Sequence, residues 1–259
     1  MTQTVENEAE NIWGYAKRLR FVREVIREAF TENRTVQVLD LGCGNGSQLA
    51  IPLAGDPRLE IVGIDPDLAS INHARELATS TGNVKFICGN VKEFAPNRHF
   101  DVVILSEVLE HLEYPAEMLV TATRLLRRDG VLIVTVPNGY GEFEIDSWVF
   151  RALRLQKLVD ALATKRELIG STDNSESGHI QFFTRSRLRR LFRQTRLVAF
   201  TERAGSFLAG PIAGHFISRS RYLINLNARI TDRLPLILAS GWYFALRRQE
   251  SASPVEANK

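Results

Sequence analysis

Short, nearly continuous apolar runs recur through the first half of the chain and alternate with segments in which apolar residues appear every three or four positions. The first pattern is typical of buried strands and the second of amphipathic helices. The predicted strands are 36–41, 59–64, 84–88, 100–105 and 131–136, and the predicted helices are 11–30, 66–77 and 114–128. This alternation predicts an α/β fold with a parallel, doubly wound sheet.

The pattern changes after residue 139. A helix is predicted over 147–168, where Trp148 and other apolar residues recur at helical spacing. A further helix over 183–196, strands over 197–203 and 241–248, and a basic amphipathic helix within about 206–235 follow. The predicted divisions are an N-terminal helical segment (1–31), a core (32–138), an insertion (139–182), a C-terminal part of the sheet (183–248) and a disordered tail (249–259).

Composition narrows the class of protein only a little. The chain has 259 residues, enough for one large α/β domain with a cap, and 44% of them are hydrophobic, which excludes wholesale disorder. A net charge of +3 is too small to indicate nucleic-acid binding. The N-terminus is polar and acidic, no apolar run is long enough to span a membrane, and Cys43 and Cys88 lie in core-type segments. We therefore expect a cytoplasmic protein with reduced thiols.

A glycine-rich turn follows the first predicted strand. Gly42, Gly44 and Gly46 occupy alternate positions, where glycine permits positive φ and lets a ligand approach the backbone. A helix beginning near Ser47 would direct its amides at that ligand. The dinucleotide fingerprint requires glycine at position 47, and Asp40 at the mouth of the strand suits a cationic ligand better than a pyrophosphate. S-adenosylmethionine carries two positive charges, an ammonium and a sulfonium.

The stretch Leu39–Gly46, Leu-Asp-Leu-Gly-Cys-Gly-Asn-Gly, closely resembles the first motif of the class I S-adenosylmethionine-dependent methyltransferases. Residues 125–138 resemble the fifth-strand signature of the same family, and the resemblance covers roughly residues 11 to 205. It implies a Rossmann-like, seven-stranded sheet, mostly parallel with an antiparallel last strand. It also implies that the insertion over 139–182 is a helical lid that binds the methyl acceptor.

The strand ends have predicted roles in binding this cofactor. Asp65 lies 23 residues after Gly42 at the end of the second strand, where a carboxylate can accept both ribose hydroxyls. Asn90 follows the third strand, where the family usually has an aspartate that bonds the adenine amino group; the amide oxygen of Asn90 can do the same. The predicted cofactor-binding residues are Asp40, Gly42, Cys43, Gly44, Asp65, Pro66, Asn90, Val91, Ser106 and Glu107.

Glu107, Glu110 and His111 follow the fourth strand. Because residues three and four apart share a helix face, we expect them to converge near the transferred methyl group. The stretch resembles two groups of enzymes, the O-methyltransferases of ubiquinone biosynthesis and the small-RNA 3′-terminal 2′-O-methyltransferases. In the second group, two glutamates and two histidines bind a metal. The resemblance implies that Glu107, Glu110, His111 and His179 could hold Mg²⁺, Mn²⁺, Fe²⁺, Co²⁺ or Zn²⁺. Without a metal, His111 is the predicted general base beside Glu107, and a purely packing role for the histidine is the alternative.

These features predict an enzyme that methylates a hydroxyl of a small or lipid-like acceptor, with Trp148 as an apolar residue of the lid. The first alternative is a metal-dependent RNA 2′-O-methyltransferase, because residues 183–196 contain six arginines that could contact phosphates. The second is a non-catalytic subunit that only binds the cofactor. The basic helices also raise the alternative of peripheral membrane contact.

Overall fold

The computed structural model describes residues 14–31, 33–94, 96, 98–139, 180–207, 217 and 220–249. The predicted helix over 147–168, with Trp148, lies outside these residues, as does His179. Gln249, which was assigned to the tail, donates its amide to the carbonyl of Arg196 at 2.8 Å, and the rest of the predicted tail also lies outside the described residues.

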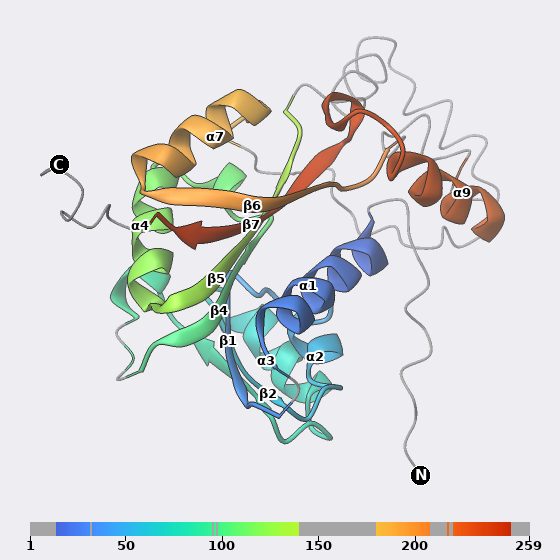
Figure 1. Ribbon diagram of the computed structural model, residues 1–259. Helices are drawn as coiled ribbons and strands as arrows, with labels where there is room; N and C mark the ends of the chain where they lie inside the picture. The colour runs from blue at the N-terminus through green and yellow to red at the C-terminus, as the bar shows by residue number, and fades with distance from the viewer. Residues whose placement is uncertain are drawn as a thin grey trace, which may run out of the picture.

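The strands form one seven-stranded sheet in the order β3-β2-β1-β4-β5-β7-β6 (Figure 1). The first five strands run parallel, and β7 lies between β5 and β6 and runs antiparallel to both. The predicted Rossmann-like methyltransferase sheet is therefore confirmed, including its antiparallel last strand. The strands are β1 Val36–Leu41, β2 Leu59–Asp65, β3 Val84–Cys88, β4 Phe100–Ser106, β5 Leu126–Pro137, β6 Leu197–Ala204 and β7 Gly241–Arg248.

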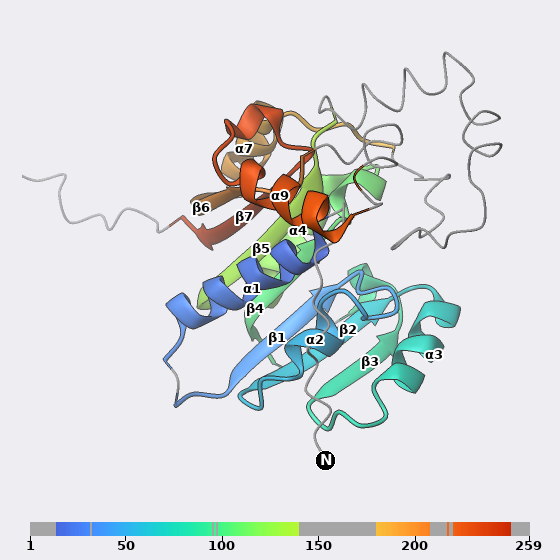
Figure 2. The same cartoon turned by 90° about the vertical axis from the view of Figure 1, so that its right-hand side faces the viewer.

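Helices cover both faces of the sheet (Figures 1 and 2). Successive side chains of a strand point to opposite faces, so Val36 and Val38 of β1 join one apolar core while Leu39 and Leu41 join the other. The first core contains side chains of α1 (Tyr15–Ala29), α2 (Ala50–Leu53) and α3 (Leu68–Leu77). The second contains side chains of α4 (Pro115–Leu125) and α7 (Arg185–Gln194). The remaining elements are α9 (Arg221–Thr231), η1 (Val91–Glu93), η2 (Leu109–His111) and η3 (Leu236–Leu238).

Two predicted helix boundaries were wrong. The helix expected over 114–128 ends at Leu125, and β5 already begins at Leu126, whose side chain is buried and which pairs with Phe100 of β4. Arg127 then belongs to the strand, and its guanidinium contacts Asp101 at 2.8 Å. The helix expected from Ser47 is a single turn, α2, which contains Pro52. This one-turn helix begins at Ala50, so it does not place N-terminal helix amides at Ser47 as predicted.

The two ends of the described chain are joined across the sheet. The hydroxyl of Tyr243, on β7, donates to the carbonyl of Gly14 at 3.1 Å, immediately before α1. Lys17 of α1 forms an ion pair with Asp232, the residue that ends α9, with a separation of 2.6 Å between Nζ and Oδ1. Within the part of the chain that the structure describes, no helix has the length and apolar character needed to cross a membrane.

Candidate active site

The three glycines after β1 have positive φ but different surroundings. Gly42, Gly44 and Gly46 have φ values of 76°, 52° and 69°. A Cβ added at Gly42 would lie 2.7 Å from a methyl group of Val108, and one at Gly46 would lie 2.5 Å from the ring of Phe86. At Gly44, a Cβ would meet no atom within 4 Å. The outer glycines therefore pack against the protein, whereas the middle one presents bare backbone to open space, as ligand binding requires.

Asp65, at the end of β2, holds this turn in place. One carboxylate oxygen accepts the amide of Gly44 at 2.8 Å, and the other accepts the amide of Asp67 at 2.9 Å. Each carboxylate oxygen has a second lone pair, so Asp65 can still accept hydrogen bonds from a ribose. Asp67 in turn caps α3 by accepting from the amides of Ala69 and Ser70. The ribose contact predicted for Asp65 stays a prediction, with the carboxylate at the edge of the glycine turn.

Asp40 is a buried carboxylate at the end of β1. Only 3% of the residue is exposed, and burial raises the pKa of its carboxyl to about 7, reinforced by the charge of Asp65 and opposed by that of Arg18. The ionised form is therefore costly in the unliganded protein. A cation placed beside it would stabilise that form, which fits the ammonium group of S-adenosylmethionine.

Cys43, Pro66, Asn90 and Val91 lie around the same edge of the sheet. The side chain of Cys43 is partly buried, and a Cβ at Gly63 would come within 2.8 Å of its sulfur. Burial, followed by the charges of Asp40 and Asp65, raises the pKa of the Cys43 thiol, so it stays protonated. Cys43 can therefore contact a ligand through its backbone groups. Pro66 and Asn90 are exposed in the turns after β2 and β3, and Val91 is buried at the start of η1.

Arg18 is the residue that sequence reasoning missed. It lies on α1 among other basic residues, yet only 5% of it is exposed. Its guanidinium donates to Oγ of Ser106 at 3.2 Å and to Oε1 of Gln48 at 3.1 Å, and lies 3.5 Å from Oε1 of Glu107. Burial lowers the pKa of Arg18, but the charge of Glu107 and the neighbouring tyrosines raise it more. No spacing singles Arg18 out among the basic residues around it, so only the tertiary fold identifies it.

Ser106 is the last residue of β4 and Glu107 follows it, and both side chains contact Thr135 of β5. Oγ of Ser106 lies 3.0 Å from Oγ1 of Thr135, whose hydroxyl donates to Oε1 of Glu107 at 2.8 Å. Glu107 has a φ of 55°, an unfavourable value for a residue with a side chain. Strained backbone of this kind concentrates at functional sites. The Glu107 carboxylate lies 3.5 Å from the guanidinium of Arg18.

Glu110 and His111 belong to η2 and lie close together, with 3.9 Å between Oε1 of Glu110 and Nε2 of His111. Glu110 is fully buried, and neither of its carboxyl oxygens has a hydrogen-bond partner among the described residues. Burial, followed by the charge of Glu107, raises the pKa of Glu110 well above its usual range. The side chain of His111 is 43% exposed. The carbonyl of Glu110 also accepts the amides of Ile180 and Gln181, which attaches the end of the 139–182 insertion to this turn.

The predicted convergence of Glu107, Glu110 and His111 on one metal ion is not seen. Within the described ranges, no three His, Cys, Asp or Glu side chains gather closely enough to hold a metal. Glu107 bonds to Thr135 and lies near Arg18 instead of joining the other two. His179, the fourth predicted ligand, lies outside those ranges, so the four-ligand set stays a prediction.

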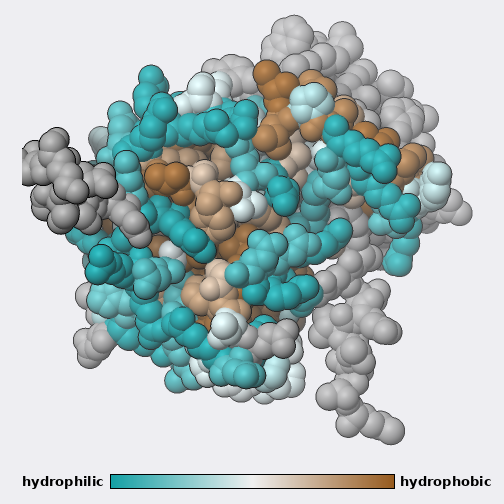
Figure 3. All heavy atoms as spheres, viewed as in Figure 1, coloured by the Kyte–Doolittle hydropathy of each residue, from teal (hydrophilic) through white to brown (hydrophobic). Residues whose placement is uncertain are grey.

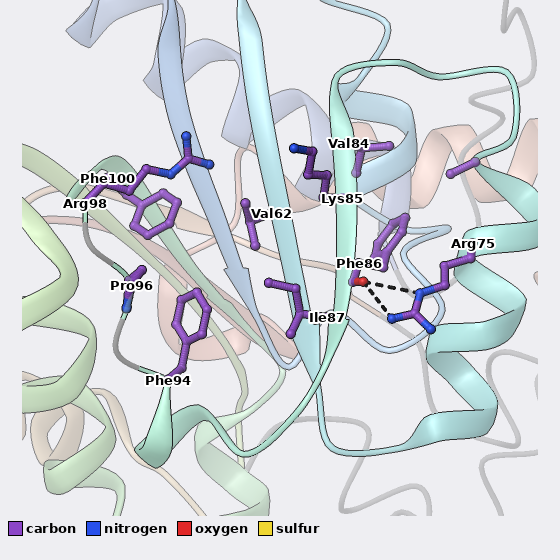
Figure 4. A pocket seen from close by; sticks show the side chains of 11 residues that line it. Val62, Arg75, Val84, Lys85, Phe86, Ile87, Phe94, Pro96, Arg98 and Phe100 are labelled. Atoms are coloured by element: carbon purple, nitrogen blue, oxygen red, sulfur yellow. Dashed lines mark hydrogen bonds between the residues drawn. The ribbon is translucent and has the colours of Figure 1, made fainter.

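A cavity of about 550 Å³ lies away from these residues (Figure 4). It surrounds the edge strand β3 and is lined by apolar side chains that include Phe86, Phe94 and Phe100. The guanidinium of Arg75 donates to the carbonyl of Phe86 at 3.0 and 3.3 Å, which caps a backbone group on β3. None of the predicted cofactor-binding residues lines this cavity. The chemistry of the site is at the carboxyl ends of β1, β2 and β4, where ligands bind in open α/β sheets.

Comparison with known proteins agrees with this arrangement. A family model described as a methyltransferase domain matches residues 13–198. The chain is 28% identical over 122 residues to the ubiquinone biosynthesis O-methyltransferase of Rickettsia canadensis (strain McKiel), a match that covers 47% of this chain and 51% of that protein. The chain thus spans about half the length of the curated relatives it matches.

Two solved structures show the fold. An S-adenosylmethionine-dependent methyltransferase from Clostridium acetobutylicum ATCC 824 has a TM-score of 0.58 at 12% identity, covering 91% of this chain and 92% of that chain. The [4+2]-cyclase SpnF also has a TM-score of 0.58, at 16% identity, covering 91% and 82%. The family model covers well over half of the chain. This protein therefore belongs to the methyltransferase-domain family and has the fold of the class I S-adenosylmethionine-dependent methyltransferases.

Proposed function

We propose that this enzyme transfers the methyl group of S-adenosylmethionine to a hydroxyl oxygen of a small or lipid-like acceptor. The observation that carries the proposal is the pairing of an open backbone face at Gly44 with the buried carboxylate of Asp40, which together suit a cationic cofactor. The relative from Rickettsia canadensis is named an O-methyltransferase, which supports oxygen as the methylated atom.

Each strand end has a role in this proposal. When bound, the cofactor supplies an electrophilic methyl group on a sulfonium. Asp40 accepts hydrogen bonds from the ammonium of the methionine part, and Asp65 accepts them from the ribose hydroxyls. The amide oxygen of Asn90 and the side chain of Val91 face the adenine. Ser106 and Glu107 border the position of the methyl group and, with Arg18, hold the site in one arrangement before the reactants meet.

His111 is the proposed general base. His111 would accept the proton of the acceptor hydroxyl as that oxygen takes up the methyl group that the bound cofactor supplies. The accessible imidazole of His111 suits this task. Glu110, 3.9 Å from the ring, is assigned a positioning role, because burial and the charge of Glu107 raise its pKa and disfavour its ionised form. We route no step through a metal, because the described residues do not gather three ligands.

The arginines of α7 give the RNA hypothesis little support. Arg185 and Arg189 both contact the carboxylate of Glu202, at 2.5 and 2.7 Å. Arg187 donates to Oε1 of Gln181 and to the carbonyl of Phe182. Half of the six arginines counted in the sequence are thus engaged within the protein. RNA methylation, with the metal set that includes His179, is kept as an outcome of the experiment below.

Labelled S-adenosylmethionine, incubated with the enzyme and a fractionated cell extract with and without chelator, tests the proposal. We expect label in the organic-soluble fraction whether or not chelator is present. A His111→Asn variant should lose most of this activity, and His73→Asn, an exposed histidine on α3, is the matched control. Label in short RNA that disappears with chelator would replace the proposal with the metal-dependent alternative. Cofactor binding without any label transfer would favour the non-catalytic subunit.

A further inference from the structure

Helix α9 buries Ile224, Asn227 and Thr231 against the protein and presents its other large apolar side chains to solvent. Asn227 and Thr231 are buried, with Asn227 donating to the carbonyl of Phe207 and Thr231 donating to the carbonyl of Asn227 at 2.7 Å. Tyr222 and Ile230, by contrast, are 72% and 42% exposed. A helix that only covered the core would have the opposite orientation.

The exposed apolar residues lie along one face of α9. Tyr222, Leu226 and Ile230 are four residues apart, so their side chains follow one another along the helix. Leu223 and Leu226 are 40% and 38% exposed. In Figure 3, brown, apolar surface lies near η3 and along part of α9, next to teal, hydrophilic surface on the same helix.

The adjoining turn, η3, adds Ile237 and Leu238, which are 75% and 46% exposed. Its backbone is fixed from inside, because Asn138 donates to the carbonyls of Ile237 and Ala239, and Trp242 donates to that of Leu236 at 2.7 Å. The apolar side chains of η3 are thus held outward by an ordered backbone. We call the α9–η3 face the set Tyr222, Leu223, Leu226, Ile230, Ile237 and Leu238.

Positive charge accompanies this face. Arg221, Arg229 and Arg233 lie within or next to α9, and all three are exposed. Asp232 is the only acidic residue between 220 and 240, and its carboxylate is paired with Lys17. Apolar side chains next to arginines that have no acidic partner among the described residues match the boundary of an anionic bilayer, where acyl chains lie directly below phosphate groups.

We propose that the α9–η3 face binds an anionic phospholipid surface. The apolar side chains enter the acyl boundary, and the arginines reach the lipid phosphates, as long cationic side chains do at membrane interfaces. A second copy of the chain fits less well, because a two-fold interface through this face would bring the same arginines together. Charge complementarity therefore favours the lipid surface.

The face is attached to the active site through α1. Lys17, which pairs with Asp232 at the end of α9, is the neighbour of Arg18, whose guanidinium lies between Ser106 and Glu107. Figure 2 shows α9 above α1, with the sheet beyond it. Resting on the proposed function, this attachment would let the enzyme collect a lipid-like acceptor from the bilayer to which it is bound.

Vesicle flotation without cofactor tests the membrane proposal independently of catalysis. The full chain should float with vesicles of phosphatidylcholine and phosphatidylglycerol, and much less with phosphatidylcholine alone. Leu226→Gln/Ile230→Gln should lower the partition coefficient at least tenfold. Arg229→Gln/Arg233→Gln should lower it by about tenfold at low salt, with a smaller effect at high salt. The control, Leu68→Gln/Leu77→Gln, changes leucines on α3 that are 56% and 45% exposed and should float like the wild type.

Several results would overturn the proposal. These are a wild-type protein that stays unbound, a Leu226/Ile230 variant that floats normally, or a control that loses binding to the same extent. A wild-type dimer in sedimentation without vesicles, converted to monomer by Leu226→Gln/Ile230→Gln, would assign the face to a second copy. Unchanged melting temperature and cofactor affinity in each variant show that the fold is intact. Flotation combined with RNA labelling would refute the proposed acceptor and leave the membrane surface standing.

Discussion

Asp40 makes a quantitative prediction about cofactor affinity and pH. Its carboxyl has a pKa of about 7 in the unliganded protein, raised by burial and by the charge of Asp65. If Asp40 must be ionised to accept the ammonium of the cofactor, binding releases a proton at any pH below 7. Between pH 7.0 and 5.5, where an α-amino group with a pKa near 8 stays mostly protonated, the dissociation constant should therefore rise roughly 16-fold.

Isothermal titration calorimetry with S-adenosylhomocysteine, which keeps the amino group but does not react, measures this dependence. Runs at pH 6 in two buffers of different ionisation enthalpy should show about 0.9 proton released on binding. Asp40→Asn should bind weakly at every pH and lose the slope. A wild-type dissociation constant that changes less than threefold over the range, or an equal slope in Asp40→Asn, would refute the role of Asp40.

The same substitution, Asp40→Asn, should weaken cofactor binding but stabilise the unliganded protein. Because the folded pKa is raised, the contribution of Asp40 to stability is fully present below the unfolded pKa, near 4, and is lost as the pH rises to about 7. A shift of about three units corresponds to about 4 kcal/mol. Unliganded Asp40→Asn should thus unfold at higher urea concentration than the wild type at pH 8, by at most this amount. Equal midpoints at pH 8 would contradict the assignment.

The remaining predictions concern the glycine turn and the buried charges. Gly44→Ala should abolish cofactor binding in titration calorimetry and cost only about 1 kcal/mol of stability. Gly46→Ala should cost several kcal/mol of stability, because its methyl group collides with an aromatic ring. Equal melting temperatures of the two variants would contradict this. Arg18→Met should destabilise the protein by about 3 kcal/mol in urea unfolding, and adding Glu107→Gln should restore part of the loss; simple additivity would show that the two charges are independent. Glu110→Gln should be as stable as the wild type below pH 4 and more stable at high pH, because the raised pKa of Glu110 makes the wild type lose stability as the pH rises. Urea titrations at pH 4 and pH 8 test this. A variant less stable than the wild type at pH 8 would refute the raised pKa of Glu110.

Local pattern predicted the sheet well, because strand burial and helix periodicity are properties of neighbouring residues. All seven predicted strands are present, and Asp67 caps α3 near its predicted start. The predicted boundary between α4 and β5 was wrong because Leu126 is as compatible with a helix as with a strand. Its pairing with Phe100 of β4 decides the matter, and no local pattern contains that information.

The site divides in the same way. Asp40 and Asp65 lie at the carboxyl ends of β1 and β2, as expected, because their positions follow from the strands that carry them. Side chains whose placement depends on tertiary contacts were not predictable: Glu107, which has a φ of 55°, bonds to Thr135 and lies near Arg18, and it does not form a metal-ligand group with Glu110 and His111. Arg18 depends on how α1 lies across the sheet, which is a tertiary property.

The position of β7 has a consequence for synthesis on the ribosome. This strand emerges last among those described, yet it lies between β5 and β6 and pairs Leu132 with Leu246. Until it arrives, β6 has no neighbour in the sheet, and Gly14 lacks the hydroxyl of Tyr243 that fixes the start of α1. The nascent chain therefore exposes the edge of β5 until β7 has been synthesised, a state in which chaperones or a second nascent chain can compete for that edge.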